Sequence, residues 1–352
     1  MNVCIHLTKR VFHNCVLPLL IFCSPAVRAQ EVSHGTIDRK AVVTRHNLIL
    51  KDPQFAGPTQ VGNGDFAYGF DITGMQTFND QFTTMSHWGW HSTEPPKGFT
   101  TDSFKQTLVE THGRMVGYDL PDPKQAALTQ WLASNPHRFN LGRLGLLLKK
   151  EDGSIAKISD LQNPVQNLDL WTGIAESNFT IEGQKVKVIT ACDPDKDIIS
   201  FKIESDLIQK GRIGIFVEFP YASLKYFSNG SDYNNPALHQ TQLDLINQNP
   251  VIFNRKLDRT TYQVACKWTG NGNVKKQKDH RYIFYPGKNK ASVEYVFAFS
   301  PSKINYTLPS FSLVKSKSTA HWSAFWKSGA AVDLSKSKDP RWFELERRIV
   351  LS

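Results

Sequence analysis

The stretch at residues 184–205, "QKVKVITACDPDKDIISFKIES", decides the fold class of this chain. Apolar and polar residues alternate at both of its ends, and a segment rich in aspartate separates the two ends. Alternation with a period of two is typical of a β-strand with one buried face, so the stretch predicts a β-hairpin. The residues of its expected inner face are Val186, Val188, Thr190, Ile199, Phe201 and Ile203.

The same period recurs along much of the chain. Further alternating segments lie at residues 213–219, 262–268 and 293–299. Asp152-Gly153 and Glu182-Gly183 supply turn signals after apolar runs. Many strands at such spacing indicate a sandwich or a barrel. We therefore predict a mainly β fold, with a large antiparallel two-sheet sandwich over residues 30–314.

A short helix interrupts the predicted strands. Asp122 and Pro123 are typical of a helix cap and a first helical residue. Leu128 and Trp131 then fall on one helical face, and the Asn-Pro pair at 135–136 ends the helix.

The last residues carry a second helical signal. Residues 315–338 begin with a lysine- and serine-rich stretch and are predicted to be a linker, and residues 339–352 begin a helix at an Asp-Pro pair. Glu344 and Arg348 are spaced to pair on this helix. Its expected apolar face consists of Trp342, Leu345 and Ile349. The helix could dock on the sandwich, but the apolar face and the absence of a C-cap favour the start of a helical domain that this sequence does not contain.

The first 29 residues are typical of an export signal. A basic start at Lys9 and Arg10 precedes an apolar core at residues 15–23, and Ala29 offers a small residue for cleavage. A membrane-spanning helix needs about 20 apolar residues, roughly twice the length of this run. We therefore predict no membrane span, and export to the periplasm or the extracellular space.

The charge of the chain does not indicate a nucleic-acid partner. The formal net charge is +10, and three of the positive residues lie in the predicted signal, which contains no acidic residue. The densest basic patch, residues 274–281, is more typical of a solvated loop or strand edge than of a nucleic-acid site. Export also argues against such a partner.

Two cysteines remain after the predicted signal, Cys192 and Cys266. They could form one disulfide or stay as two buried thiols, because a chain of this size buries a core without covalent cross-links.

Four segments resemble the bacterial six-hairpin glycosidase proteins, which are related to glycoside hydrolase family 65 and its clan. The resemblance covers nearly all of the chain after the signal, and its most specific part is the closing segment. The segments are "VGNGDFAYGFDITGMQTF" at 61–78, "SHWGWH" at 86–91, "NPHRFNLGRLGL" at 135–146 and "FWKSGAAVDLSKSKDPRWFELERRIVLS" at 325–352.

This resemblance implies a β-supersandwich, a linker and an (α/α)6 barrel, with residues 339–352 as the start of the first helix of a truncated barrel. It also implies inverting hydrolysis or phosphorolysis of glycosidic bonds by a glutamate acid in the barrel, so no catalytic residue is assigned in this chain. The implied partners are an oligosaccharide or polysaccharide and the protein's own helical barrel. We expect a glycosidase as the complete protein and an inactive chain alone. The alternative is a non-catalytic carbohydrate-binding or structural β-sandwich module.

The candidate substrate-binding residues are His87, Trp88, Trp90 and His91. Aromatic rings stack on the apolar faces of pyranose rings, and imidazoles form hydrogen bonds with hydroxyl groups. In the alternative interpretation, the tryptophans close the open end of the sandwich or pack at its interface with the barrel.

Three other segments are weaker candidates for ligand contact. Residues 63–65 predict a tight turn. His137, Arg138 and Arg143 could bind substrate, but the neighbouring Asn-Pro pair favours a structural turn. Residues 231–239, "SDYNNPALH", form a polar loop with one aromatic residue and one histidine.

An aspartate-rich segment resembles a calcium loop in its spacing. Asp193, Asp195 and Asp197, with Glu204, match the ligand positions of such a loop. Ile198 takes the place of the required glycine, and strand alternation follows it at once. We therefore predict a polar hairpin turn here, and no metal or other cofactor.

Overall fold

The computed structural model describes residues 36–352, except 55–56, 121, 224–227 and 245–248. The chain divides into two units, Met1–Ile37 and Asp38–Ser352, and the helices and strands described below belong to the second. The predicted export signal lies outside the described residues. Within the described residues, no helix combines the length and the apolar character needed to cross a membrane.

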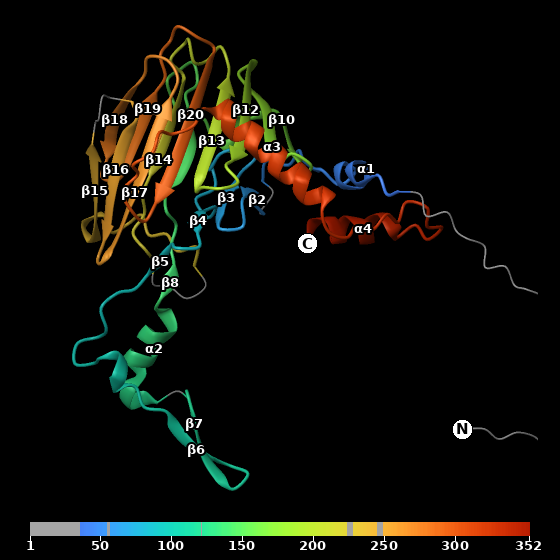
Figure 1. Cartoon of the computed structure of the whole chain (residues 1–352). Helices are drawn as coiled ribbons and strands as arrows, with labels where there is room; N and C mark the ends of the chain where they lie inside the picture. The colour runs from blue at the N-terminus through green and yellow to red at the C-terminus, as the bar shows by residue number, and fades with distance from the viewer. Residues whose placement is uncertain (1–35, 55–56, 121, 224–227, 245–248) are drawn as a thin grey trace, which may run out of the picture. The chain divides into compact units, whose positions relative to one another are not determined.

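The largest element is an antiparallel sheet of nine strands (Figure 1). Its predicted central hairpin is confirmed, because Val188 pairs with Ile203 and Cys192 pairs with Ile199. The strands, in spatial order, are β1 (Leu48–Leu50), β10 (Gln162–Asp169), β11 (Ile174–Ile181), β12 (Gln184–Cys192), β13 (Ile198–Glu204), β20 (Ser292–Ser300), β17 (Thr260–Trp268), β16 (Val251–Leu257) and β15 (His239–Asp244).

Two smaller antiparallel sheets complete the sandwich. One consists of β18 (Asn273–Lys278), β19 (Arg281–Tyr285), β14 (Ile213–Glu218) and β9 (Arg143–Leu148), and the other of β2 (Thr59–Gly62), β3 (Phe66–Phe70) and β4 (Thr84–Ser86). Buried side chains from all three sheets form one core; examples are Phe201, Phe297, Ile215, Phe284 and Tyr68. The predicted mainly β sandwich is therefore confirmed. The basic patch at 274–281 includes exposed β18, which is an edge strand as expected.

The remaining regular elements are short. The predicted helix is confirmed: Asp122 accepts a hydrogen bond from the Lys124 amide, and the helix ends before the Asn135–Pro136 peptide. The elements are β5 (Trp90–His91), β6 (Thr107–Thr111), β7 (Arg114–Tyr118), β8 (His137–Arg138), α2 (Ala126–Ser134), and the 3₁₀ helices η1 (Thr101–Ser103), η2 (Pro123–Gln125), η3 (Ile158–Asp160) and η4 (Pro236–Leu238).

The segment at 61–78 forms a hairpin and an internally bonded loop. Gly64 has φ +96°, and the side-chain oxygen Oδ1 of Asn63 accepts from the backbone amides of Asp65 and Phe66, so the predicted tight turn is confirmed. The side-chain nitrogen Nδ2 of Asn63 donates to the Asp193 carbonyl oxygen at 3.0 Å. This turn is therefore joined to the aspartate-rich turn between β12 and β13.

Asp71 organises the loop that follows β3. Its carboxylate is buried and accepts from the Thr73 amide at 3.0 Å, the Thr73 hydroxyl at 2.6 Å, the Phe78 amide at 2.7 Å and the Asn79 amide at 3.4 Å. Burial raises the pKa of Asp71, and the hydrogen bonds from Thr73 oppose that rise. One carboxylate thus supplies the acceptors for both ends of the loop.

Helix α3 (Phe311–Lys327) covers the outer face of the nine-stranded sheet. The Ser310 hydroxyl accepts from the Leu313 amide and caps the helix, and Phe311 and Val314 pack on buried side chains of β12, β13, β17 and β20. The predicted linker at 315–338 is therefore helical as far as Lys327. Its lysines and serines alternate with apolar residues at helical spacing, which composition alone conceals.

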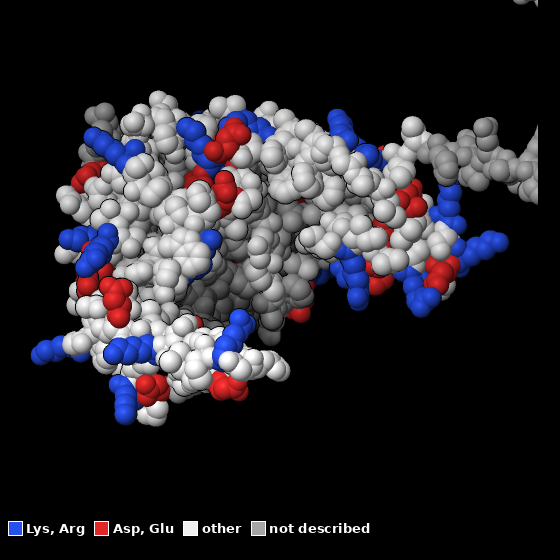
Figure 2. All heavy atoms as spheres, turned by 60° about the horizontal axis from the view of Figure 1, so that its bottom comes forward, with Lys and Arg blue, Asp and Glu red and all other residues white. Residues whose placement is uncertain are grey.

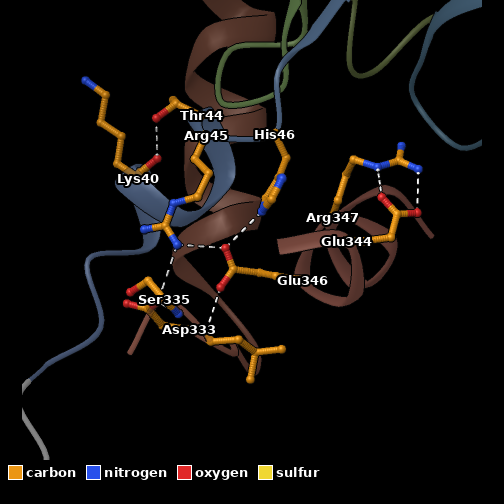
Figure 3. Close-up of polar contacts among 10 residues, drawn as sticks. Lys40, Thr44, Arg45, His46, Asp333, Ser335, Glu344, Glu346 and Arg347 are labelled. Carbon is orange, nitrogen blue, oxygen red and sulfur yellow. Dashed lines mark hydrogen bonds and ion pairs between the residues drawn. The ribbon is translucent and has the colours of Figure 1, made fainter. Parts of the chain in front are cut away.

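Helices α1 (Arg39–Thr44) and α4 (Trp342–Leu351) are joined by charged side chains (Figure 3). The Glu346 carboxylate is fully buried, 2.9 Å from Nε2 of the fully buried His46 and 2.8 Å from an Arg45 guanidinium nitrogen. Its other oxygen accepts from the Leu334 amide at 2.6 Å. A buried glutamate with three polar partners thus fixes α4 against the segment at 45–46.

The aliphatic residues of the predicted apolar face of α4 are exposed: Leu345 is 54% exposed and Ile349 is 45% exposed. Trp342, the third residue of that face, is half-buried, with the Arg45 guanidinium carbon 5.6 Å from its ring centroid. The predicted pairing of Glu344 with Arg348 is confirmed at 2.8 Å. Hence α4 buries a glutamate and presents aliphatic side chains outward.

Cys192 and Cys266 are buried and are not bridged. Burial raises the pKa of both thiols, so they are inert components of the core.

Candidate functional site

Three of the segments singled out from the sequence meet beside the sandwich core. Strand β5 pairs with β8, which places Trp90 beside Arg138 and His91 beside His137. The side chain of Asn140, just after β8, donates to the Ser231 hydroxyl at 3.1 Å. The segments at 86–91, 135–146 and 231–239 are therefore neighbours in space.

Trp90 is the more exposed of the two tryptophans in the "SHWGWH" segment. Trp90 is 47% exposed. The Arg138 guanidinium carbon lies 4.3 Å from the centroid of its indole ring. Arg138 also donates to the Ser86 carbonyl oxygen. The indole is thus held by a cation–π contact and a backbone anchor.

Trp88 is part of the packing instead. Its indole nitrogen donates to the Asp197 carboxylate at 2.6 Å, and its ring lies 5.9 Å from the Tyr262 ring. The same carboxylate accepts from the Ser86 hydroxyl at 2.6 Å. Trp88 therefore connects the "SHWGWH" segment to the turn between β12 and β13.

His91 is buried in a hydrogen-bonded row of side chains. Its Nε2 lies 3.0 Å from an Asp258 carboxylate oxygen, and its Nδ1 lies 3.0 Å from the Thr260 hydroxyl. The Tyr221 hydroxyl donates to the same Asp258 oxygen at 2.7 Å. Burial lowers the pKa of His91 although Asp258 opposes this, so the ring is neutral near pH 7. Nε2 lies close to the Asp258 carboxylate without the geometry of a hydrogen bond.

Asp258 is the accessible end of this row. Its side chain is 38% exposed. One of its two carboxylate oxygens contacts both the His91 ring and the Tyr221 hydroxyl. Within the described residues, no hydrogen bond or ion pair reaches the second oxygen. Asp258 can therefore accept a hydrogen bond from a ligand hydroxyl.

The other two histidines of the region differ in setting. His87 is exposed, with Nδ1 3.8 Å from an Asp65 carboxylate oxygen. His137 Nδ1 lies 2.8 Å from the Ser134 carbonyl oxygen, and its Nε2 is buried without a hydrogen-bond partner among the described residues. Burial lowers the pKa of His137, so the ring is neutral near pH 7.

A polar cleft of about 640 Å³ lies next to this row, and Tyr221 borders both. Asp232 accepts from the Asn234 amide at 2.8 Å and from the Asn235 side chain at 2.6 Å. Other lining residues are Asp80, Gln81, Asn229, Ser231 and Tyr233. Carboxylates, amides and hydroxyls in one cleft suit a ligand with many hydroxyl groups.

Two of the weaker sequence candidates lie elsewhere in the structure. Arg143 donates to the carbonyl oxygens of Gln76 and Thr77, so it supports the loop that Asp71 organises. In the aspartate-rich turn, Asp193 and Asp195 contact the Lys317 amino group at 3.0 and 2.6 Å. These side chains are therefore occupied by structural partners.

Tyr221, Asp258 and Thr260 were not predicted from the sequence. Asp258 lies in the tight turn between β16 and β17, with φ +49°, and Tyr221 follows β14. The "LDRT" stretch at 257–260 indicates only a turn between strands. A tertiary contact over more than 100 residues joins it to His91.

The surface of the molecule carries charges of both signs. On the face shown in Figure 2, lysine and arginine side chains are interspersed with acidic ones. Hydroxyl recognition needs hydrogen-bonding groups rather than a field of one sign, and the cleft supplies them.

Comparison with known proteins supports the fold. No protein-family model matches the sequence, and no curated protein matches it. A solved structure assigned as a kojibiose phosphorylase from the human microbiome matches with a TM-score of 0.52 and 12% identity over 88% of this chain. The chain spans 41% of that protein's length. The chain thus shares the fold of part of that solved structure.

A bacterial glucoamylase solved with acarbose also matches, with a TM-score of 0.36 and 9% identity. That match covers 52% of this chain and 31% of the glucoamylase. It is too loose to bear on the fold.

Proposed function

We propose that this chain is the N-terminal, substrate-supporting part of an exported glycoside hydrolase of the inverting, six-hairpin type. The observation that carries the proposal is the exposed Trp90, stacked on Arg138, beside a carboxylate-bearing row and a polar cleft. The fold shared with part of a phosphorylase supports it. Export rests on the predicted signal at residues 1–29.

The chemistry of the site fits a sugar. The face of a pyranose ring is a row of C–H groups that stacks on an indole, and Trp90 offers an exposed one. Hydroxyl groups at the ring edge need acceptors and donors, which Asp258 and the cleft residues provide. Of the four residues proposed from the sequence, Trp90 carries the stacking role and His87 borders the region. The buried His91 lies behind Asp258 and positions it, and Trp88 supports the segment.

Catalysis is assigned to a helical domain outside this chain. Inverting hydrolysis needs a protonated carboxylic acid and a second carboxylate about 6.5–9.5 Å apart across the sugar. The matched phosphorylase has further length beyond the matched part, where such a domain could lie. In this proposal α4 belongs to the first helix of that domain, and the sandwich contributes binding.

The second candidate function is a carbohydrate-binding module without catalysis. It is favoured by the position of Trp90, Asp258 and the cleft, which all lie within one chain. Both functions require sugar binding at Trp90, and they differ in the activity of the complete protein.

Trp90→Ala is expected to weaken oligosaccharide binding by about 1–3 kcal/mol and to leave the fold intact, because an exposed stacking ring is typical of a binding hot spot. Isothermal titration calorimetry with a panel of oligosaccharides that includes kojibiose measures the change. Circular dichroism checks the fold of each variant.

Phe325→Ala is the matched control, because Phe325 is an aromatic residue on α3 that is 53% exposed. The control should bind as the unmodified chain does. Equal affinities of the Trp90 variant and the unmodified chain, or an equal loss in both variants, would remove Trp90 from the site.

A further inference from the structure

The hairpin formed by β6 and β7 has no third strand beside it in the described chain (Figure 1). Its two strands pair from Thr107–Tyr118 to Thr111–Arg114 around a turn at His112 and Gly113. Both turn residues have positive φ, +50° and +82°, as in a type I′ turn.

The hairpin exposes apolar side chains. Leu108 is 64% exposed, Met115 is 58% exposed and Tyr118 is 42% exposed. An isolated two-stranded hairpin is at best marginally stable in water, and strands that form a wider sheet gain stability. Each free edge also carries unpaired backbone donors and acceptors. The hairpin would therefore be stabilised by a third strand from outside the described chain.

We propose that β7 pairs antiparallel with β7 of a second copy of this chain, about a two-fold axis at Val116. This inference concerns assembly and does not depend on the proposed sugar site. The result is a four-stranded sheet shared by two chains, with the order β6, β7, β7 and β6. A contact of this kind uses the same surface in both copies and closes as a dimer.

The backbone of β7 permits this register. In a hairpin with a two-residue turn, Thr111 and Arg114 form a hydrogen-bonded pair, and such pairs alternate along the ladder. Val116 therefore directs its amide and carbonyl toward β6, while Met115 and Gly117 direct theirs outward. With the axis at Val116, each outward Met115 lies opposite the outward Gly117 of the other copy, so their groups can bond.

The side chains of β7 favour the same register. Arg114 lies opposite Tyr118 of the second copy, and the symmetry repeats this pair. A guanidinium beside a phenol ring is an attractive cation–π combination. Self-pairing of β6 about Val109 would instead place Leu108 opposite Glu110 twice, an aliphatic chain against a carboxylate. The edge of β7 is therefore the better match to itself.

Analytical ultracentrifugation of the chain over a range of concentrations tests the proposal. The unmodified chain should form a reversible dimer. Val116→Lys places two like charges at the axis and should raise the dimer dissociation constant at least about tenfold. Val109→Lys is the matched control, because Val109 pairs with Val116 in the hairpin and is similarly half-buried, and it should leave the constant within about threefold.

Cysteine cross-linking tests the register itself. In the proposed dimer, Val116 of one copy lies opposite Val116 of the other as a non-hydrogen-bonded pair. The Cα atoms of such a pair are about 4.5 Å apart, a distance that a disulfide can span. Val116→Cys should therefore form a covalent dimer on mild oxidation, and Val109→Cys should not. The tested protein starts at residue 30, which removes Cys4, Cys15 and Cys23. Cys192 and Cys266 are buried and should not react.

Three results would overturn the proposal. The first is a monomer at all concentrations up to about 100 μM, which would assign the hairpin to another partner, such as a helical domain or a polysaccharide. The second is a dimer that Val116→Lys does not weaken. The third is cross-linking of Val109→Cys as fast as that of Val116→Cys.

Discussion

Asp71→Ala is expected to lower the free energy of unfolding by about 3–5 kcal/mol, because it leaves several buried donors without an acceptor. Four donor groups of the loop after β3 converge on this carboxylate. Asp71 is only 6% exposed. Water would therefore have to enter the buried interior to replace its carboxylate as the acceptor. Urea denaturation monitored by tryptophan fluorescence measures the loss.

Asp80→Ala is the control for this prediction. Asp80 lies in the same region but is exposed, and within the described residues its carboxylate accepts only from the exposed Gln81 side chain. Its removal should change the free energy of unfolding by less than about 0.5 kcal/mol. A loss below about 1 kcal/mol for Asp71→Ala would show that the loop bonds to water or rearranges without cost.

Acidification from pH 6.5 to pH 5 is expected to cost about 2 kcal/mol of stability through His239 alone. His239 is buried, its Nδ1 accepts from the buried Arg255 guanidinium at 2.7 Å, and its ring stacks on His280 at 3.7 Å. Burial, and then the charge of Arg255, lower the pKa of His239 to about 3.

The sign follows from proton uptake. In the unfolded chain His239 titrates near its ordinary pKa of about 6.5, so below that pH the unfolded state binds a proton that the folded state refuses. Stability is therefore fully present above pH 6.5 and decreases as the pH falls toward 3. The window from pH 6.5 to 5 lies above the range in which most carboxylates titrate.

The slope of the free energy of unfolding against pH, measured by urea denaturation at pH 7, 6, 5.5 and 5, tests this prediction. His239→Asn retains an acceptor for Arg255 but cannot titrate, so its slope should be smaller than that of the unmodified chain. His91 and His137, whose pKa values are also lowered by burial, should leave a residual slope. Parallel slopes in both proteins would exclude His239 as a source of the acid sensitivity.

The sandwich could be predicted from the sequence because strand alternation is a local signal. The residues from Val186 to Ile203 alternate with a period of two, and the structure pairs them as expected. The helix at α3 was hidden, because its buried face consists of spaced residues such as Phe311 and Val314 within a polar composition. Its packing on the sheet decides its structure, and a local pattern does not report that packing.

The candidate site was predictable only in part. Aromatic and imidazole content indicated the "SHWGWH" segment, but it could not distinguish the exposed Trp90 from Trp88, which Asp197 holds. Asp258 gave no signal at all, since its importance comes from contacts with Tyr221 and His91, both distant in sequence. Such a row arises from the arrangement of the sheets, which periodicity does not specify.

The most direct test of the account is an assay of the purified chain for release of reducing sugar from glycosides, with and without inorganic phosphate. Without a positioned general acid, which typically contributes about 10²–10⁴-fold, the chain should show no hydrolysis or phosphorolysis above background. The complete protein should be active on the same substrates. Robust turnover by the chain alone, abolished by Asp258→Asn or Asp232→Asn, would contradict the assignment of binding to the sandwich and of catalysis to a separate helical domain.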